Sequence, residues 1–338
     1  MYQLPTTMES VRVAYKKDDF GNDMFVRLAW SKEPSETPKP LGRFRQSYWV
    51  LLDANTIAAL IFHGGGLLVG SSEIIPKPQV EWLTSQGFLV AIPNYRLAPQ
   101  VTGKTSFADC EEAYDWIVKA LHNIKGSTHT IEIDSSRVVA MGHSSGGTIA
   151  LHLASNRPVK AVTAFYPSLY ISDTTSSAHQ PTSAPPFGMF PDFTPSEDDW
   201  TAIKPTGQQL SEVALSPPGA PMPPRSKWQF SILKNGQWIS TLCPDGDYTS
   251  LDPLTQVNAN WPPTMIVQGE TDHVPGSGLD LAQRAEKELK AAGVKEVKLA
   301  IVPGEGHMFD LPPTVGTSDL GPKWQAVVEG LEFLKGQV

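Results

Sequence analysis

Cysteine is almost absent from this chain of 338 residues, which contains only Cys110 and Cys243. Two cysteines exclude a disulfide framework and a cysteine-rich zinc site, and we expect both to be free thiols. Charge is also scarce, because Asp, Glu, Lys and Arg make up 18% of the residues, against about a quarter in an average globular domain. The formal net charge of −8 disfavours contact with a phosphate backbone, so we expect no nucleic-acid partner.

Long apolar runs are missing as well, and none approaches the roughly 18 residues that a membrane-spanning helix needs. The first residues, from Met1 to Pro5, include neither a basic nor an apolar segment, so we predict no signal peptide and expect a cytoplasmic location. The triplet Asp245-Gly246-Asp247 resembles part of a calcium loop but lacks the spaced ligands, and we interpret it as a turn. We therefore predict no bound metal.

What the chain does contain, from residue 56 onwards, is an alternation of short apolar runs and amphipathic segments. The apolar runs are typical of parallel strands buried on both faces. We predict such strands at residues 57–62, 88–92, 137–141, 159–166, 264–267 and 297–302. Two earlier strands with alternating polarity are predicted at residues 11–15 and 24–30, joined by a turn at 18–22.

Between the apolar runs, apolar and small residues recur at helical spacing. This spacing predicts helices at residues 80–86, 106–123, 147–155, 279–292 and 324–334. Strands that alternate with helices predict an α/β fold, with a mostly parallel, doubly wound sheet flanked by helices.

The alternation stops between about residues 168 and 260, a stretch that holds 13 of the 30 prolines. A structureless loop of this length is improbable in a compact domain, and its many aromatic residues argue against a solvated linker. We predict that residues 169–260 form a cap or lid insertion. Residues 1–168 and 261–338 would then form the catalytic core.

The pentapeptide Gly142-His143-Ser144-Ser145-Gly146 lies where a predicted strand meets a predicted helix. A serine on such a turn projects its hydroxyl from the end of the sheet, and the flanking glycines relieve the close contacts of a strained turn. The pattern therefore predicts Ser144 to be a nucleophile. The alternative is an ordinary serine N-cap before a helix.

A serine hydroxyl needs a base, and that base must lie at a strand end on the same edge of the sheet. His307 follows the last predicted strand in a glycine-rich loop, and we predict it to be the base, with His273 as the alternative. Asp272 follows another strand and is predicted to orient His307, with Glu270 as the alternative. The order Ser144, Asp272, His307 is that of the nucleophile-elbow hydrolases.

A glycine run at residues 63–66, His-Gly-Gly-Gly, follows the strand predicted at 57–62. Consecutive glycines allow backbone N–H groups to converge on a developing oxyanion, and the N–H of Ser145 would add a further donor. No Lys-Ser or Lys-Thr pair follows the run, so it is not a phosphate-binding P-loop.

Together these motifs resemble the hormone-sensitive-lipase-like branch of the α/β-hydrolase fold, over about residues 57–167 and 261–338. The resemblance rests on His63-Gly64-Gly65-Gly66, Gly70-Ser71, Asn94-Tyr95-Arg96-Leu97-Ala98-Pro99, Gly142-His143-Ser144-Ser145-Gly146-Gly147, Asp272 and His307. It implies ester hydrolysis through an acyl-enzyme without a cofactor. It also implies that the oxyanion is bound by the N–H groups of Gly65 and Gly66.

Several residues depart from the pattern of that family. His143 and Ser145 replace the acid and the small residue of the usual Gly-Asp-Ser-Ala-Gly, and His273 follows Asp272 where Pro-Leu is usual. Asn94 stands where an acid often precedes the tyrosine. These departures leave the three predicted catalytic residues intact and suggest a divergent member that acts on a specialised metabolite.

The sequence thus predicts a serine carboxylesterase for a hydrophobic, small-to-medium substrate. Amide or lactone hydrolysis, acyl transfer and elimination on a biosynthetic intermediate remain as alternatives at the same site. A non-catalytic receptor on this fold is less favoured, because such receptors lose one of the three catalytic residues. The family resemblance also leaves a homodimer open. Candidate substrate contacts are Leu67, His143, Phe187, Phe190 and His273.

Overall fold

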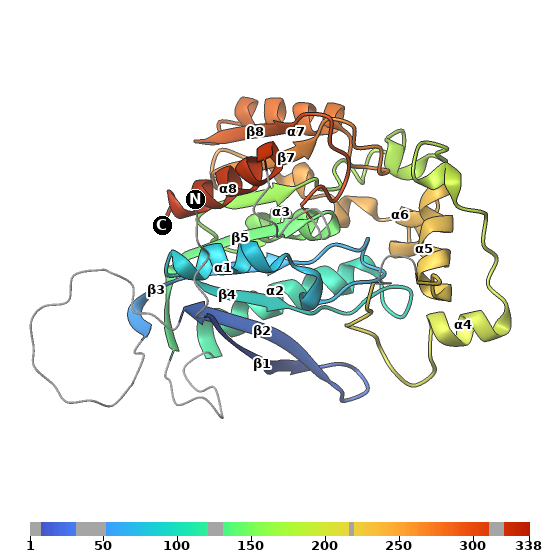
Figure 1. Ribbon diagram of the computed structural model, residues 1–338, viewed down its shortest axis with the longest axis horizontal. Helices are drawn as coiled ribbons and strands as arrows, with labels where there is room; N and C mark the ends of the chain where they lie inside the picture. Colours follow the sequence, from blue (N-terminus) through green and yellow to red (C-terminus); the bar gives the residue numbers. More distant parts are fainter. Residues whose placement is uncertain (1–7, 32–51, 121–130, 216–219, 311–320) are drawn as a thin grey trace, which may run out of the picture.

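The computed structural model describes residues 8–31, 52–120, 131–215, 220–310 and 321–338. Within these ranges, the strands form one eight-stranded sheet in the order β1-β2-β4-β3-β5-β6-β7-β8 (Figure 1). β2 runs antiparallel to both β1 and β4, and the pairs from β4 through β8 are parallel. The predicted α/β fold with a mostly parallel sheet is confirmed.

The strands are β1 (Met8–Lys17), β2 (Asp23–Ser31), β3 (Leu52–Phe62), β4 (Leu89–Pro93), β5 (Ile131–His143), β6 (Val162–Phe165), β7 (Thr264–Gly269) and β8 (Val297–Val302). The helices that flank the sheet are α1 (Lys77–Ser85), α2 (Gly103–Ala120), α3 (Ser145–Asn156), α7 (Leu279–Ala291) and α8 (Gly321–Lys335). Between β6 and β7 lie α4 (Glu197–Ile203), α5 (Pro224–Lys234) and α6 (Trp238–Leu242).

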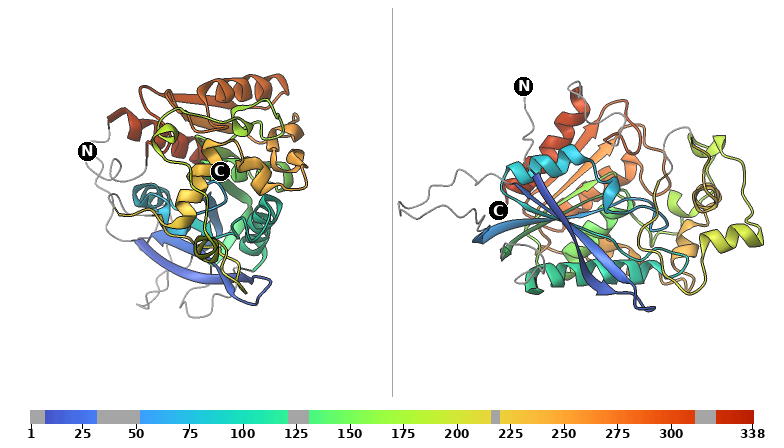
Figure 2. Two further views of the ribbon diagram at one scale, coloured as in Figure 1. Left: turned by 90° about the vertical axis from the view of Figure 1, so that its right-hand side faces the viewer. Right: turned by 60° about the horizontal axis from the view of Figure 1, so that its bottom comes forward.

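Apolar side chains fill both faces of the sheet, which explains why the sequence of its central strands is almost continuously apolar. Every residue of β4 is buried. Phe107 of α2, Ile149 of α3 and Leu289 of α7 belong to the core on one face. Leu83 of α1 and Leu331 of α8 belong to the core on the other face, so helices cover the sheet on both sides (Figure 2).

The element boundaries differ from the sequence prediction where polar residues or proline obscure the pattern. β5 begins at residue 131, because it stays paired with β3 on both sides of the polar residues 134–137. β6 covers Val162–Phe165, a shorter strand than the predicted 159–166. α1 begins at Lys77, with Pro78 in its first turn, a position that helices tolerate. Residues 121–123 of the predicted second helix lie outside the described ranges.

The segment between β6 and β7 contains short helices rather than one long loop. α4 begins with a capping box formed by Ser196 and Asp199, and α5 begins with Pro224. Figure 1 shows α4, α5 and α6, in yellow and orange, gathered at one end of the sheet. The segment also returns to the core, where Val213 pairs with Gly70 in a β-bridge. The division into a separate cap at residues 169–260 stays a prediction.

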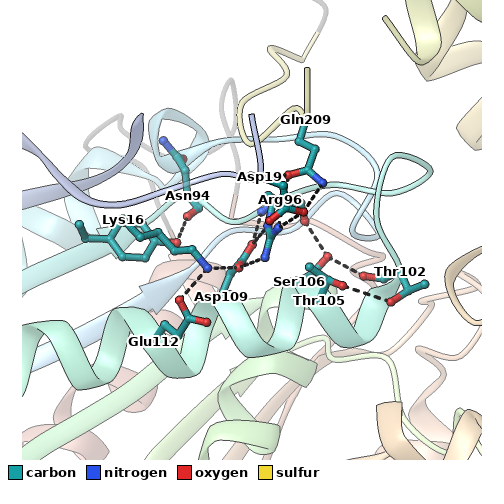
Figure 3. Close-up of polar contacts among 11 residues, drawn as sticks. Lys16, Asp19, Asn94, Arg96, Thr102, Thr105, Ser106, Asp109, Glu112 and Gln209 are labelled. Atoms are coloured by element: carbon teal, nitrogen blue, oxygen red, sulfur yellow. Dashed lines mark hydrogen bonds and ion pairs between the residues drawn. The ribbon is translucent and has the colours of Figure 1, made fainter. Parts of the chain in front are cut away.

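A buried ion-pair network fixes the loop that follows β4 (Figure 3). The guanidinium of Arg96 donates to both carboxylate oxygens of Asp109 in α2, at 2.9 and 2.8 Å, and the hydrogen bonds raise the pKa of Arg96. Lys16 of β1 also contacts Asp109, at 2.6 Å. Gln209, from the segment between β6 and β7, accepts a hydrogen bond from Arg96 at 3.3 Å. The network therefore links the N-terminal hairpin, α2 and that segment.

Candidate active site

Ser144 occupies the sharp turn between β5 and α3, with a φ of 56° and a ψ of −126°. A positive φ is strained for a serine. The neighbouring backbone also leaves no room for a side chain at positions 142 and 146. A Cβ atom on Gly142 would lie 2.1 Å from the carbonyl oxygen of Gly146, and one on Gly146 would lie 2.1 Å from that of Phe62. Both glycines are therefore required for β5 and α3 to meet at this angle.

The loops after β7 and β8 bring Asp272 and His307 to Ser144. His307 Nε2 lies 2.9 Å from Ser144 Oγ, and His307 Nδ1 lies 2.7 Å from Asp272 Oδ2. Asp272 is held in turn by hydrogen bonds from Gln268 Nε2 at 2.9 Å and from the Val274 N–H at 2.9 Å. The carboxylate of Asp272 is inaccessible to solvent and the imidazole of His307 is about one-tenth exposed. Both groups are therefore largely shielded from water, which strengthens the interaction between them.

The alternative residues that the sequence left open lie elsewhere. Glu270 is exposed and accepts a hydrogen bond from the Gly304 N–H at 2.7 Å, which ties the two loops together. His273 is exposed to solvent. The structure therefore groups Ser144, His307 and Asp272, and places neither His273 nor Glu270 in that group.

The glycine run after β3 lies beside this group. Gly65 and Gly66 have φ angles of 117° and 65°, values that favour glycine, and both residues are partly exposed. The N–H of Gly66 donates to Ser145 Oγ at 3.0 Å. One of the predicted oxyanion donors therefore already has a hydroxyl partner, because this chain carries serine where the family usually has a small apolar residue.

Two residues that touch the glycine run carry no sequence signal for doing so. Gln229 Nε2 donates to the carbonyl oxygen of Gly65 at 2.9 Å, and Trp238 Nε1 donates to that of Gly66 at 2.8 Å. Both lie in the proline-rich segment between β6 and β7, where no motif marks them. Their spacing from the glycines, 164 and 172 residues, makes the contacts purely tertiary.

His63 begins the glycine run and is fully buried, stacked on Tyr95 with ring centroids 4.2 Å apart. Its Nδ1 lies 2.8 Å from the carbonyl oxygen of Gly64, a contact that requires a proton on that nitrogen. Burial lowers the pKa of His63 to about 4, so the ring is neutral at pH 7.

Acidification is expected to destabilise the fold through His63. The pKa of His63 is about 4 in the folded protein against 6.5 for an unperturbed histidine, so the unfolded chain binds the proton more tightly. The stabilisation is complete above about pH 6.5 and is lost as the pH falls towards 4, a loss of about 3 kcal/mol. Urea unfolding across this pH range measures it, and His63→Gln should show a shallower pH dependence. Equal pH dependence in both proteins would contradict this assignment.

A second buried polar cluster lies beside the elbow, the sharp turn at residues 142–146 that carries Ser144. His143 Nε2 lies 2.9 Å from Gln79 Oε1 and 3.1 Å from Asp310 Oδ2. Asp310 also accepts hydrogen bonds from Gln79 Nε2, at 2.6 Å, and from the Tyr166 hydroxyl. The Tyr166 ring packs on His307, with centroids 4.6 Å apart. His143 is thus enclosed in a buried polar network, and its contact with substrate stays a prediction.

Burial by itself would raise the pKa of Asp310. The imidazole of His143 and the hydrogen bonds from Tyr166 and Gln79 outweigh that effect and hold the pKa of Asp310 below its usual value. Asp310 stands three residues after His307. An acid so close to the predicted base is the one sequence signal that points to this cluster.

The other candidate substrate contacts fall into two groups. Leu67 is buried and lines a small, mainly apolar cavity beside the elbow, together with Phe107, Ser145, Trp238 and Leu242. Phe187 and Phe190 instead pack against Phe230 within the segment between β6 and β7. Substrate contact by any of these residues stays a prediction.

Comparison with known proteins identifies the fold. Residues 59–224 match a family model described as alpha/beta hydrolase fold. A thermophilic esterase from Thermogutta terrifontis superimposes with a TM-score of 0.60 over 99% of this chain and 93% of its own, at 17% identity. The protein is therefore an α/β hydrolase by fold. Its motifs resemble those of the hormone-sensitive-lipase-like branch, and the matched family model supports that resemblance.

The chain is also similar to parts of two much longer proteins that are named as synthases. The non-reducing polyketide synthase ausA of Penicillium brasilianum is 28% identical over 84% of this chain, and methylphloroacetophenone synthase of Cladonia uncialis is 28% identical over 90% of it. This chain spans 13% of the length of each of them.

Among the residues that the structure describes, no helix combines the length and apolar character needed to cross a membrane. The same ranges contain no group of three or more His, Cys, Asp or Glu side chains that could hold a metal ion.

Proposed function

We propose that this protein is a serine hydrolase that cleaves a carboxylic ester through an acyl-enzyme. The observation that carries the proposal is the contiguous chain of hydrogen bonds from Ser144 Oγ through His307 to Asp272. Nucleophile, base and orienting acid in this geometry are the elements of a catalytic triad. The family and the fold support hydrolase chemistry, while the esterase reaction itself is our inference.

In the proposed mechanism, Ser144 Oγ attacks the ester carbonyl while His307 Nε2 takes the hydroxyl proton. Asp272 keeps the imidazole in the required tautomer and stabilises its charged form. The tetrahedral intermediate collapses as His307 returns the proton to the leaving alcohol. Water then attacks the acyl-enzyme, again with His307 as base, and the carboxylic acid and free Ser144 are released.

The oxyanion would be bound by the N–H groups of Gly65, Gly66 and Ser145. For Gly66 to take part, its N–H must serve both Ser145 Oγ and the oxyanion, or the Ser145 hydroxyl must rotate away from it.

A second candidate is hydrolysis or transfer of an activated acyl group in specialised metabolism, such as the acyl group of a thioester. The observation that favours it is the similarity to proteins named non-reducing polyketide synthases. The same serine chemistry serves both candidates, and they differ in the leaving group and, for transfer, in the acceptor that replaces water.

The test is a panel of p-nitrophenyl esters from acetate to decanoate, with acyl thioesters of N-acetylcysteamine beside it and labelling by a fluorophosphonate probe. Ester turnover that varies with chain length supports the esterase, and turnover confined to thioesters supports the second candidate. Labelling without any turnover would direct the search to amides, lactones or biosynthetic intermediates. Silence in every assay would overturn the hydrolase proposal in favour of a receptor.

A further inference from the structure

The carbonyl groups of all three glycines in the run have side-chain partners. The carbonyl oxygen of Gly64 contacts His63 Nδ1 at 2.8 Å. That of Gly65 accepts from Gln229 Nε2, and that of Gly66 accepts from Trp238 Nε1. In a trans peptide the C=O and N–H groups point in opposite directions, so a fixed carbonyl also fixes the N–H of the next residue.

We propose that Gln229 and Trp238 are positioning residues that hold the oxyanion loop, a role that rests on the proposed hydrolase function. Gln229 fixes the peptide that carries the Gly66 N–H, and Trp238 fixes the next peptide. In the peptide between Gly65 and Gly66, the carbonyl accepts from Gln229 and the Gly66 N–H donates to Ser145 Oγ, beside the nucleophile. The segment between β6 and β7 would therefore hold the oxyanion-binding backbone in place in addition to covering the site.

Packing around the loop supports this role. Trp238 is 2% exposed and Gln229 is 8% exposed, so neither donor exchanges freely with water. A Cβ atom on Gly66 would lie 3.3 Å from Trp238 Nε1 and 3.5 Å from Gln229 Nε2, which shows that both side chains are seated directly on that glycine. Gly65 and Gly66 have positive φ angles, which glycine permits but does not enforce. Contacts from other residues are therefore needed to hold the loop in this conformation.

Arg225 extends the contact by one helical turn. It precedes Gln229 by four residues on α5, so both side chains lie on one face of that helix. Arg225 Nε donates to the carbonyl oxygen of Leu68 at 2.6 Å, and its Nη atoms donate to those of Ala98 and Ile203. The side chain is buried among these neutral acceptors, and burial lowers the pKa of Arg225 to about 10. A buried cation that binds backbone carbonyls anchors α5 to the loop after β3.

The test removes each donor while preserving bulk, in Trp238→Phe and Gln229→Met. Each variant is expected to lower kcat about tenfold, less than the roughly 10²- to 10³-fold loss when an oxyanion donor itself is removed. KM should change less than about twofold, because the ground-state ester gains little from the oxyanion donors. The loss should be equal for acetate and longer esters. A loss that grows with acyl length would instead make Trp238 a wall of the acyl pocket and overturn the proposal.

Trp200→Phe is the matched control. Trp200 lies on α4 of the same segment, is 42% exposed and packs against Trp228 rather than the glycine run. The kcat of Trp200→Phe should match that of the wild type. If Trp238→Phe does not fold, Gln229→Met decides the question alone. Unchanged kcat in a folded variant, with only a lower Tm, would overturn the positioning role.

Hydrogen–deuterium exchange gives a readout that needs no substrate. Peptides covering residues 63–70 should exchange faster in Trp238→Phe and Gln229→Met than in the wild type, while peptides from β7 keep their rates. If no ester or thioester is hydrolysed, the proposed function fails, and exchange still decides whether the two side chains hold the loop. Unchanged loop exchange in both variants would overturn the inference.

Discussion

Replacing Ser144 with alanine is expected to lower kcat for p-nitrophenyl butyrate by roughly 10⁴- to 10⁶-fold, because the acyl-enzyme can no longer form. The variant should fold normally, since the change only removes the hydroxyl group of a partly exposed residue. Fluorophosphonate labelling should disappear with the activity. Initial rates at saturating ester, with protein concentration fixed by absorbance, measure the effect.

Ser136→Ala serves as the control, because this serine is exposed and its hydroxyl donates a hydrogen bond to Asp134. A further check is the double variant Ser144→Ala, His307→Ala. Residues that act as one unit are strongly non-additive, so the double variant should be about as slow as Ser144→Ala alone. Retention of more than about 1% of kcat in Ser144→Ala would refute the assignment of the nucleophile.

Replacing Asp310 with asparagine is expected to reduce the free energy of unfolding by roughly 3–5 kcal/mol. The change leaves His143 beside an amide in a fully buried site and removes the carboxylate that accepts from Tyr166 and Gln79. Because its pKa is depressed in the folded protein, Asp310 stabilises the fold above about pH 4 and this contribution is lost at lower pH. Urea unfolding near pH 7 measures the effect.

Asp198→Asn is the matched control, because Asp198 is exposed on α4 and its replacement should change stability by less than about 0.5 kcal/mol. Since Tyr166 also packs on His307, Asp310→Asn should lower kcat as well. A stable, fully active Asp310→Asn protein would show that the cluster beside the elbow neither supports the fold nor orients the base.

The fold and the candidate triad are open to sequence analysis because local patterns mark them. Ser144 sits between glycines at a strand end, and Asp272 and His307 each follow an apolar run. Parallel strands bring their carboxyl ends to one edge, so residues at those ends meet even when 163 residues separate them. The catalytic roles themselves stay predictions.

Residues that act through tertiary contacts escape the same approach. Trp238 and Gln229 reach the glycine run from a segment without regular alternation, and nothing local distinguishes them from other buried aromatic or amide side chains. His143 departs from the family pattern in the sequence, yet its partner Asp310 lies far along the chain, after β8. A departure at one position thus becomes intelligible only once the compensating residue is seen beside it.

The hydrogen bonds from α5 and α6 to the glycine run also bear on how such enzymes diversify. A chimera that received the corresponding segment of a relative would gain a new pocket, but it would lose the amide and indole donors of Gln229 and Trp238 unless the graft carried equivalents. Substrate range and rate would then change in the same evolutionary step. Engineering of selectivity in this protein is therefore best confined to pocket residues outside these two donors.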